Sequence, residues 1–175
     1  MTLGYLSAIS EWKKWISAGM PVMDESVPFN KHTDYNRCQI DSPNGPLTLT
    51  IPIQKYEGKS CRIGDVMMSE HGDWRHKHWH ALSSTYFNSP FFEYYQDDFK
   101  LIYFGNQRRL VDFNTQLNQL IIELLSLKSL KQSIYNNQHS TTQYYQVFAH
   151  KHGFITNLSI IDLLFNLGPE AILTL

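Results

Sequence analysis

Apolar side chains recur at helical spacing along much of the chain, with glycine, proline or serine residues between the runs. A repeat of three and four residues predicts amphipathic helices. The clearest run is Leu110–Lys128, where leucine, isoleucine and phenylalanine side chains form one continuous stripe. The other predicted helices are Leu3–Ala18, which ends at Gly19, Trp74–Tyr86, which Asp73 would cap, Phe91–Phe104, and a last helix to Asn166.

The last predicted helix has two candidate N-caps. Asn157 or Ser159 would accept a hydrogen bond from the first free backbone N–H groups. Ser159 and Asp162 also have the spacing of a capping box. Gly168-Pro169 would end the helix, because glycine is the usual residue beyond a helix end and proline cannot continue it.

Alternation of apolar and polar side chains predicts a β-hairpin from Tyr35–Asp41 and Leu47–Ile53. Asn44-Gly45 would supply the positive φ of its turn. Two further strands are predicted at Ile63–Met68 and Tyr144–Phe148. The segment Ser129–Thr142 is predicted to be a loop that contains a short element. The elements predict one α+β domain over residues 1–175. It would have a small mixed or antiparallel sheet, with the β-hairpin packed against several helices and a mainly helical C-terminal half.

The composition narrows the class of protein. The chain has 15 basic and 16 acidic residues, which argues against a nucleic-acid partner, since such proteins usually present a basic face. No apolar run is long enough to span a bilayer. The two cysteines, Cys38 and Cys61, form no metal-binding pair, and no secretion signal is visible. We therefore expect a cytoplasmic protein with reduced thiols.

The segment with the most unusual chemistry runs from Trp74 to Tyr95 and is rich in histidine and aromatic residues. On a helical wheel His76 and His80 face solvent, so the histidines do not converge on a metal. His78 instead lies among the residues of the buried face, Trp74, Ala81, Leu82 and Thr85. Two interpretations of His78 remain: a core histidine with satisfied hydrogen bonds, or a general base or substrate-binding group in a cleft.

A second group of polar residues lies near the C-terminus. Gln146 in the predicted strand, His152 and Asn157 would lie at one rim, where a helix N-terminus would hold an anion. Cys38, His152 and Asn157 also follow the order of a thiol-nucleophile triad. That signal is weak, because Cys38 is predicted inside a strand and not at a helix N-terminus that would lower its pKa.

Several cations and one amide are candidate binding groups. Arg37, which follows Asn36, would fork onto a carboxylate or phosphate, or form a structural salt bridge. Lys77 and Arg75 add candidate phosphate contacts. No P-loop, dinucleotide-binding glycine motif, nucleophile elbow or zinc-protease motif is present.

These residues resemble the WbqC-like family. The resemblance rests on strings in the family's order: Asn36-Arg37-Cys38-Gln39-Ile40, Leu49-Thr50-Ile51-Pro52-Ile53, Ile63-Gly64-Asp65-Val66, Trp74-Arg75-His76-Lys77-His78-Trp79, Ser89-Pro90-Phe91-Phe92-Glu93-Tyr94-Tyr95, and Asn157 through Pro169. It runs from about Tyr5 to Ala171. Family members often open with a short strand before the first helix, and here only four residues precede Tyr5.

The resemblance implies a biosynthetic pathway for this chain, but no catalytic mechanism. Members occur in gene clusters for O-antigen and other surface polysaccharides, and one proposed activity is transfer of an aminoacyl group such as glycine onto a sugar. The family's signatures fall on Lys77, His78 and Trp79, and near the C-terminus on His152, Gly153, Asn157 and Asp162.

Two functions follow as hypotheses. In the first, the chain is a sugar-modifying transferase with a sugar or nucleotide-sugar ligand: His78 or His152 is the general base, and Arg37 and Lys77 hold an anionic donor. The aromatic side chains of Trp79, Tyr94 and Tyr95 would then stack on a sugar ring, and Asn36, Gln146 and Asn157 would complete the binding site. In the second, the chain is a non-catalytic binding or assembly protein of the same pathway. Neither the cofactor nor the oligomeric state follows from the residues.

Overall fold

A single antiparallel hairpin lies among helices in the part of the chain that the structure describes. This is a computed structural model, and it describes residues 2–30, 34–56, 61–127 and 143–175. Its elements are α1 (Ile9–Ser17), β1 (Arg37–Ser42), β2 (Gly45–Thr50), η1 (Ile63–Asp65), α2 (Trp74–Tyr86), α3 (Phe92–Tyr103), α4 (Leu110–Leu124), α5 (Ala149–His152), α6 (Ile160–Leu167) and η4 (Gly168–Leu173). The α+β class is confirmed.

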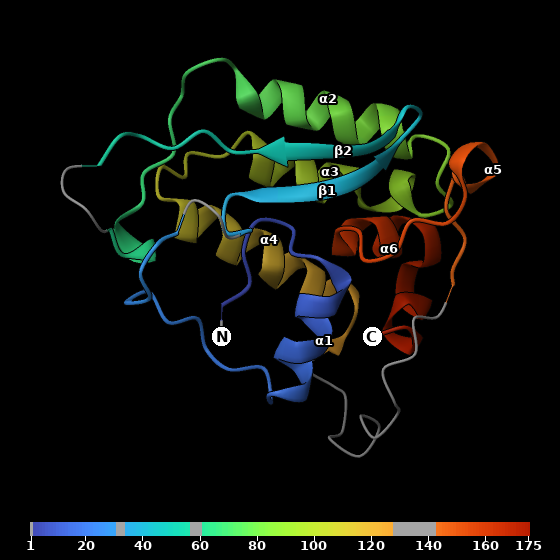
Figure 1. The fold of residues 1–175 in the computed structure, drawn as a ribbon, viewed down its shortest axis with the longest axis horizontal. Coiled ribbons are helices and arrows are strands. Elements are labelled where there is room, and N and C mark those ends of the chain that lie inside the picture. Colours follow the sequence, from blue (N-terminus) through green and yellow to red (C-terminus); the bar gives the residue numbers. More distant parts are fainter. Residues whose placement is uncertain (1, 31–33, 57–60, 128–142) are drawn as a thin grey trace.

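The hairpin follows the predicted turn chemistry. Strands β1 and β2 pair from Arg37 with Thr50 to Ser42 with Gly45, so Pro43-Asn44 forms the two-residue connection. The positive φ falls on Gly45 alone, at 97°. Figure 1 shows α2 along one side of the hairpin, α1, α4 and α6 on the other, and α5 near the turn.

Helices α4 and α6 contribute a large share of the core. The predicted stripe of α4 is buried at Leu110, Phe113, Leu117 and Ile121. In α6 every residue from Ile160 to Asn166 is buried, so this short helix lies inside the molecule instead of lying on its surface. It contacts α1, α3 and β1. The confirmed helices α2 and α3 pack beside each other, with Trp79 of α2 against Tyr103 of α3.

Ser159 joins three distant parts of the chain. Its hydroxyl donates to the carbonyl of Leu6 at 2.7 Å, and its backbone N–H donates to the carbonyl of Gln39 in β1. Ala8 and Ser159 form a β-bridge. The N-terminal segment is therefore irregular, with a turn at Tyr5-Leu6 in which Leu6 has φ 44°. The predicted helix Leu3–Ala18 is wrong in its first part for this reason, because these backbone groups bond across the core and not along a helix.

Two predicted strands are wrong. Ile63–Met68 opens as the 3₁₀ helix η1, and only Met67 and Met68 form isolated β-bridges. Tyr144–Phe148 is irregular, although it contains the apolar and aromatic residues typical of a strand. The side chain of Gln146 bonds both backbone groups of Ile155, as the backbone of a neighbouring strand would. Pattern alone does not reveal this substitution of side chain for backbone.

Two helix predictions need smaller corrections, and one predicted helix cap is confirmed. The helix predicted to Lys128 ends at Leu124. Asp73 stands at the N-cap of α2 but its side chain makes no capping bond, because its backbone is left-handed, with φ 50°. Ser159 caps α6, as one of the two alternatives predicted, by accepting from the Ile161 N–H at 3.4 Å. The predicted loop Ser129–Thr142 lies outside the described residues.

Gly168 ends α6 in a conformation that glycine alone adopts easily, with φ 58° and ψ −134°. A β-carbon there would lie 2.5 Å from the Phe91 ring. Gly168→Ala is expected to lower the free energy of unfolding by roughly 2–4 kcal/mol, since left-handed strain and overpacking each cost about 1–3 kcal/mol. Gly19→Ala is the matched control, because Gly19 has φ 80° and open space around it. Urea denaturation of both variants measures the difference, and equal losses would contradict the packing argument.

Candidate functional site

The side chain of Gln146 closes a small loop that presents His152. Its amide donates to the carbonyl of Ile155 at 2.8 Å and accepts from the Ile155 N–H at 2.9 Å. These two bonds imitate a strand pair and join the two arms of the loop that contains α5. Gln146 is buried, with 2% of its surface exposed. It therefore holds the loop, and its predicted contact with a ligand stays a prediction.

His152 reaches from this loop to a buried carboxylate on the hairpin. Its Nε2 lies 3.1 Å from Asp41 Oδ1 and 3.2 Å from the carbonyl oxygen of Ser42. Both are acceptors, so Nε2 carries a proton, while Nδ1 lies 3.4 Å from the carbonyl oxygen of Gly153. The His152 side chain is 22% exposed, whereas that of Asp41 is 2% exposed. Nε2 hydrogen bonds to the Ser42 carbonyl and lies within ion-pair distance of the buried Asp41 carboxylate. An imidazole that solvent can reach is thus held beside a buried acid, an arrangement that a general base can use.

A second buried carboxylate, Asp162, anchors the same loop. Tyr86 of α2 donates to its Oδ1 at 2.9 Å, and Tyr144 donates to its Oδ2 at 2.6 Å. Gln146 lies 3.4 Å from Oδ2 as well. Asp162 is 1% exposed. The predicted capping box with Ser159 is therefore wrong, because the carboxylate points at these tyrosines and not at the helix end.

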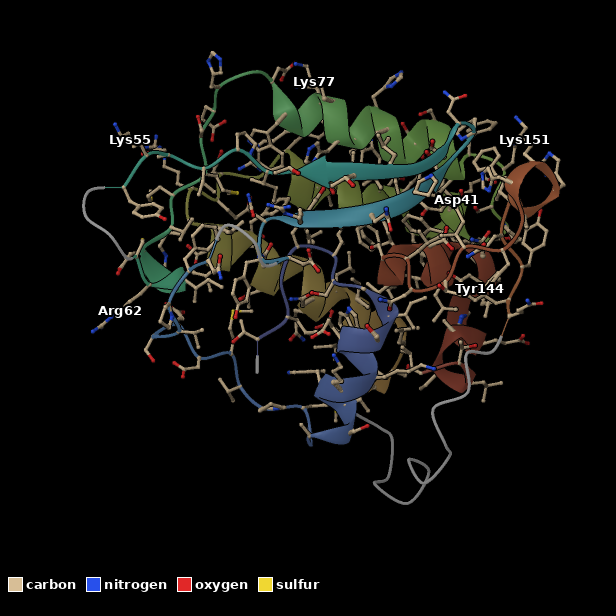
Figure 2. The ribbon with its side chains drawn as sticks, viewed as in Figure 1. Asp41, Lys55, Arg62, Lys77, Tyr144 and Lys151 are labelled. Carbon is tan, nitrogen blue, oxygen red and sulfur yellow. The ribbon has the colours of Figure 1, made fainter. Side chains whose placement is uncertain are left out.

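The two buried carboxylates influence each other. Burial raises the pKa of Asp162 to about 6; the hydrogen bonds from Tyr144 and Tyr86 oppose this rise, and the charge of Asp41 adds to it. Burial also raises the pKa of Asp41, while the neighbouring His152 lowers it. Figure 2 shows Asp41, Tyr144 and Lys151 of α5 on one side of the molecule. Burial thus raises the pKa of both carboxyl groups, and buried carboxyl groups with shifted pKa values are frequent at functional sites.

His78 has a partner for each ring nitrogen. Tyr5 bonds to its Nδ1 at 2.9 Å, Tyr5 in turn contacts the hydroxyl of Tyr103 at 2.5 Å, and the ring bonds the backbone of Thr50. His78 is 6% exposed, and burial lowers its pKa to about 4. Of the two interpretations left open by the sequence, this geometry favours the satisfied core histidine. A catalytic role for His78 stays a prediction.

The hairpin separates the two predicted histidines. His78 bonds the backbone of Thr50, at the open end of the hairpin, and His152 contacts Ser42, next to the turn. Five residue steps divide these ends, or roughly 17 Å at strand spacing. Arg37 pairs with Thr50 and so belongs to the His78 end. These residues do not form one cluster.

The remaining predicted binding residues are dispersed. Asn36 is buried and donates to the carbonyl of Ile51 at 2.9 Å, which extends the hairpin. Asn157 accepts from the Ser10 N–H at 2.9 Å and so caps α1. Lys77 points outward from α2 (Figure 2). The aromatic residues differ in exposure: Trp79 packs on Phe92 and Tyr103, Tyr95 stacks on Phe91, and Tyr94 is 76% exposed.

The thiol triad finds no support in the geometry. Cys38 is buried in the core, and burial raises the pKa of its thiol. A nucleophilic cysteine requires the opposite shift. Asn157 is engaged with α1, as described above. Both cysteines are free. Within residues 2–30, 34–56, 61–127 and 143–175, no three histidine, cysteine or acidic side chains are grouped to hold a metal ion.

His76 and His80 face solvent, as predicted. The sequence argument overlooked a neighbouring carboxylate: Asp73 Oδ1 lies 2.6 Å from His76 Nδ1, three residues away on the helix. His76 also packs against Phe104 of α3, with ring centres 4.7 Å apart. This side chain thus contributes to the contact between two helices.

The sequence analysis missed the two carboxylates as site residues. Asp162 gave two signals, because it falls on the family's C-terminal signature and is the single charged residue in the apolar run Ile160–Leu167. A carboxylate at such a position must find donors. Asp41 gave none, since an acidic residue beside a hairpin turn is common. Tyr86 and Tyr144 became visible only through their contact with Asp162.

The chain matches a known family over most of its length. The sequence model of the WbqC-like protein family matches residues 2–137 and 131–174. The chain belongs to the WbqC-like family. No curated protein sequence and no solved structure matches it. Among the described residues of this WbqC-like protein, none of the helices has the length and apolar character needed to cross a bilayer.

The buried acid and the buried histidine should give opposite pH dependences of stability. The pKa of His78 is lowered from 6.5 to about 4, so only the unfolded chain gains this proton between those values, and acidification destabilises the fold. The pKa of Asp162 is raised from 3.8 to about 6, so the folded chain gains its proton first, and acidification stabilises the fold. Each effect amounts to roughly 3 kcal/mol at most.

Substitution of Asp162 or of His78 should separate their two effects on the pH dependence of stability. Between pH 7 and pH 4.5, Asp162→Asn is expected to lose more unfolding free energy than the wild type, because only the histidine effect remains. His78→Gln should lose less. Urea denaturation at several pH values measures both. Parallel pH curves for all three proteins would contradict the assigned pKa directions.

Removing the hydroxyl of Tyr5 should lower the free energy of unfolding more than removing the hydroxyl of the exposed Tyr94. Tyr5→Phe leaves His78 Nδ1 buried without a donor, which should lower the free energy of unfolding by about 1–3 kcal/mol. Tyr94→Phe removes a hydroxyl from a side chain that is 76% exposed and should change stability by less than about 0.5 kcal/mol. Thermal unfolding compares them. A neutral Tyr5→Phe would argue against the hydrogen-bonded chain.

Proposed function

We propose that this WbqC-like protein is a transferase that moves an acyl group, such as glycyl, onto an amine or hydroxyl of a sugar in surface-polysaccharide assembly. The resemblance to proteins from such gene clusters supports the substrate class. The pairing of the solvent-accessible His152 with the buried Asp41 supports the chemistry. It is the observation on which the proposal mainly depends.

His152 would act as the general base. As the acceptor oxygen or nitrogen attacks the acyl carbon, Nδ1 takes its proton, and the bond to the leaving group of the activated acyl donor breaks. Asp41 stabilises the imidazolium that forms, because its charge lies beside Nε2. The Gln146 bonds to Ile155 keep the imidazole in place, so little ordering is needed at the moment of reaction.

The predicted contacts with the anionic donor and with the sugar ring remain hypotheses. Lys151 lies next to His152 on α5, at the rim of the molecule in Figure 2, and would serve an anionic donor better than Lys77, which lies on α2. A sugar-stacking role for Trp79 would require its indole to leave the contacts with Phe92 and Tyr103. Tyr94 needs no such change, since it is already exposed.

A non-catalytic binding or assembly protein is the second candidate. The observation in its favour is the number of large apolar side chains that α2, α3 and their flanking residues expose. Such side chains often mark contact surfaces. A thermal-shift screen with nucleotide sugars, aminoacyl donors and divalent metal ions distinguishes the two, because a ligand of the folded state raises its melting temperature. The transferase should respond to a sugar nucleotide or an acyl donor, and the assembly protein to neither.

His152→Gln should lower acyl transfer by about 10²–10⁴-fold, the usual contribution of a general base. Glutamine keeps a donor for Asp41 but cannot take the proton. The assay follows incorporation of labelled glycine, supplied as an activated ester or thioester, into nucleotide-linked amino sugars by mass spectrometry.

His150→Gln is the matched control. His150 lies on the same short helix, is exposed, and contacts the carbonyl of Val147 instead of a carboxylate. It should transfer at the wild-type rate. If His152→Gln were as active as His150→Gln in a protein that transfers glycine, His152 would not be the base; if no donor and acceptor pair reacted, the assembly protein would be favoured.

A further inference from the structure

Phe148 is an aromatic residue that lies next to the candidate base. The centre of its ring is 6.5 Å from that of the His152 imidazole, within the usual range for neighbouring rings. Its backbone carbonyl accepts from the N–H of Lys151 at 2.8 Å, in the first turn of α5. Burial raises the pKa of Asp41, and an interaction with the Phe148 backbone opposes this rise. The carboxylate beside His152 therefore also contacts the backbone that carries the Phe148 ring.

The ring of Phe148 is half-buried but does not contribute to the hydrophobic core. Among the described residues, neither the buried apolar side chains of the core nor those packed against them include Phe148. Other aromatic candidates for a sugar contact differ, because Trp79 and Tyr95 pack against the core. Tyr94 has its ring against Phe91. Phe148 thus offers a large aromatic surface that folding does not use, and such surfaces commonly line binding sites.

The loop around Phe148 combines this aromatic ring with positive charge. The ammonium of Lys151 lies 5.5 Å from the ring centre, in a cation–π contact. Residues 143–161 include no acidic side chain, and the two carboxylates that the loop contacts, Asp41 and Asp162, are buried. The exposed charge of the loop itself is therefore positive. This suits the anionic donor of the proposed reaction and leaves the aromatic ring for the second substrate.

We propose that the ring of Phe148 is the stacking surface for the sugar acceptor, an inference that rests on the proposed function. The C–H groups of one pyranose face pack well on an aromatic ring, whose negative face attracts them. A sugar on Phe148 and an anionic donor on Lys151 both lie beside His152, so the two reactants meet at the base with little further loss of freedom. Phe148 thereby selects a sugar acceptor over a smaller amine or alcohol.

Isothermal titration calorimetry of the full chain with UDP-glucosamine and with UDP tests the sugar contact, because only the first probe carries a pyranose. The wild type should bind UDP-glucosamine more tightly than UDP. Phe148→Leu should weaken binding of UDP-glucosamine about tenfold and change binding of UDP by less than about twofold, since leucine is apolar but has no aromatic face. Phe148→Tyr keeps the ring and should restore the tighter binding of UDP-glucosamine.

Tyr145→Leu is the matched control. Tyr145 belongs to the same loop, is 57% exposed and precedes Gln146, whereas Phe148 follows it. Its replacement should leave both affinities unchanged, and thermal unfolding shows that each variant folds. Equal binding of UDP-glucosamine and UDP by the wild type overturns the proposal. An unchanged affinity in Phe148→Leu overturns it too, as does an equal loss in Tyr145→Leu.

His152→Gln separates this inference from the proposed function. This variant should still bind UDP-glucosamine while its glycyl transfer falls. If transfer depends on His152 but sugar binding does not depend on Phe148, the proposed function stands and the sugar contact is wrong. If sugar binding depends on Phe148 while His152→Gln transfers at the wild-type rate, the sugar contact stands and the assigned base is wrong.

Discussion

The buried carboxylate of Asp162 sets the strongest constraint on this structure. A carboxyl group inside an apolar helix must find hydrogen-bond donors, because burying it alone would cost several kcal/mol. Tyr86 of α2 and Tyr144 supply them. Helix α2, the central helix α6 and the segment that leads to α5 are thereby tied together at one point. The orientation of His152 depends on this anchor, since Gln146 belongs to the same network.

The hairpin separates two different uses of histidine. At its open end His78 is enclosed with Tyr5 and lacks access to solvent. Near its turn His152 keeps one ring nitrogen free of a strong partner while Asp41 holds the other. Burial lowers the pKa of His78, which keeps it neutral and suits it to a structural bond. The same side chain therefore serves stability at one end and, in our proposal, proton transfer at the other.

The outer surface of α2 and α3 exposes apolar side chains, unlike the hydrogen-bonded surroundings of the two histidines. Helix α3 buries Phe92, Phe99 and Tyr103 but leaves Tyr94 and Leu101 in solvent. These exposed apolar side chains are the observation that favours the non-catalytic candidate. A site for chemistry near the hairpin turn and a contact surface on the helical pair are compatible, since they use different residues. Family membership, which the chain shares with other WbqC-like proteins, supports neither assignment by itself.

The sequence by itself determined the local elements. The helices α2 and α3, the hairpin and its glycine turn, and the inward side of His78 follow from periodicity and turn chemistry, which act over a few residues. Tertiary structure decided the rest. Leu3–Leu6 is irregular because its backbone groups bond to distant segments, Leu6 to Ser159 and Tyr5 to Tyr35. Tyr144–Phe148 forms no strand, and the bonds that join it to Ile155 come from the side chain of Gln146. The pairing of Asp41 with His152 joins positions 111 residues apart, and no local pattern records such a contact because it exists only once the chain has folded.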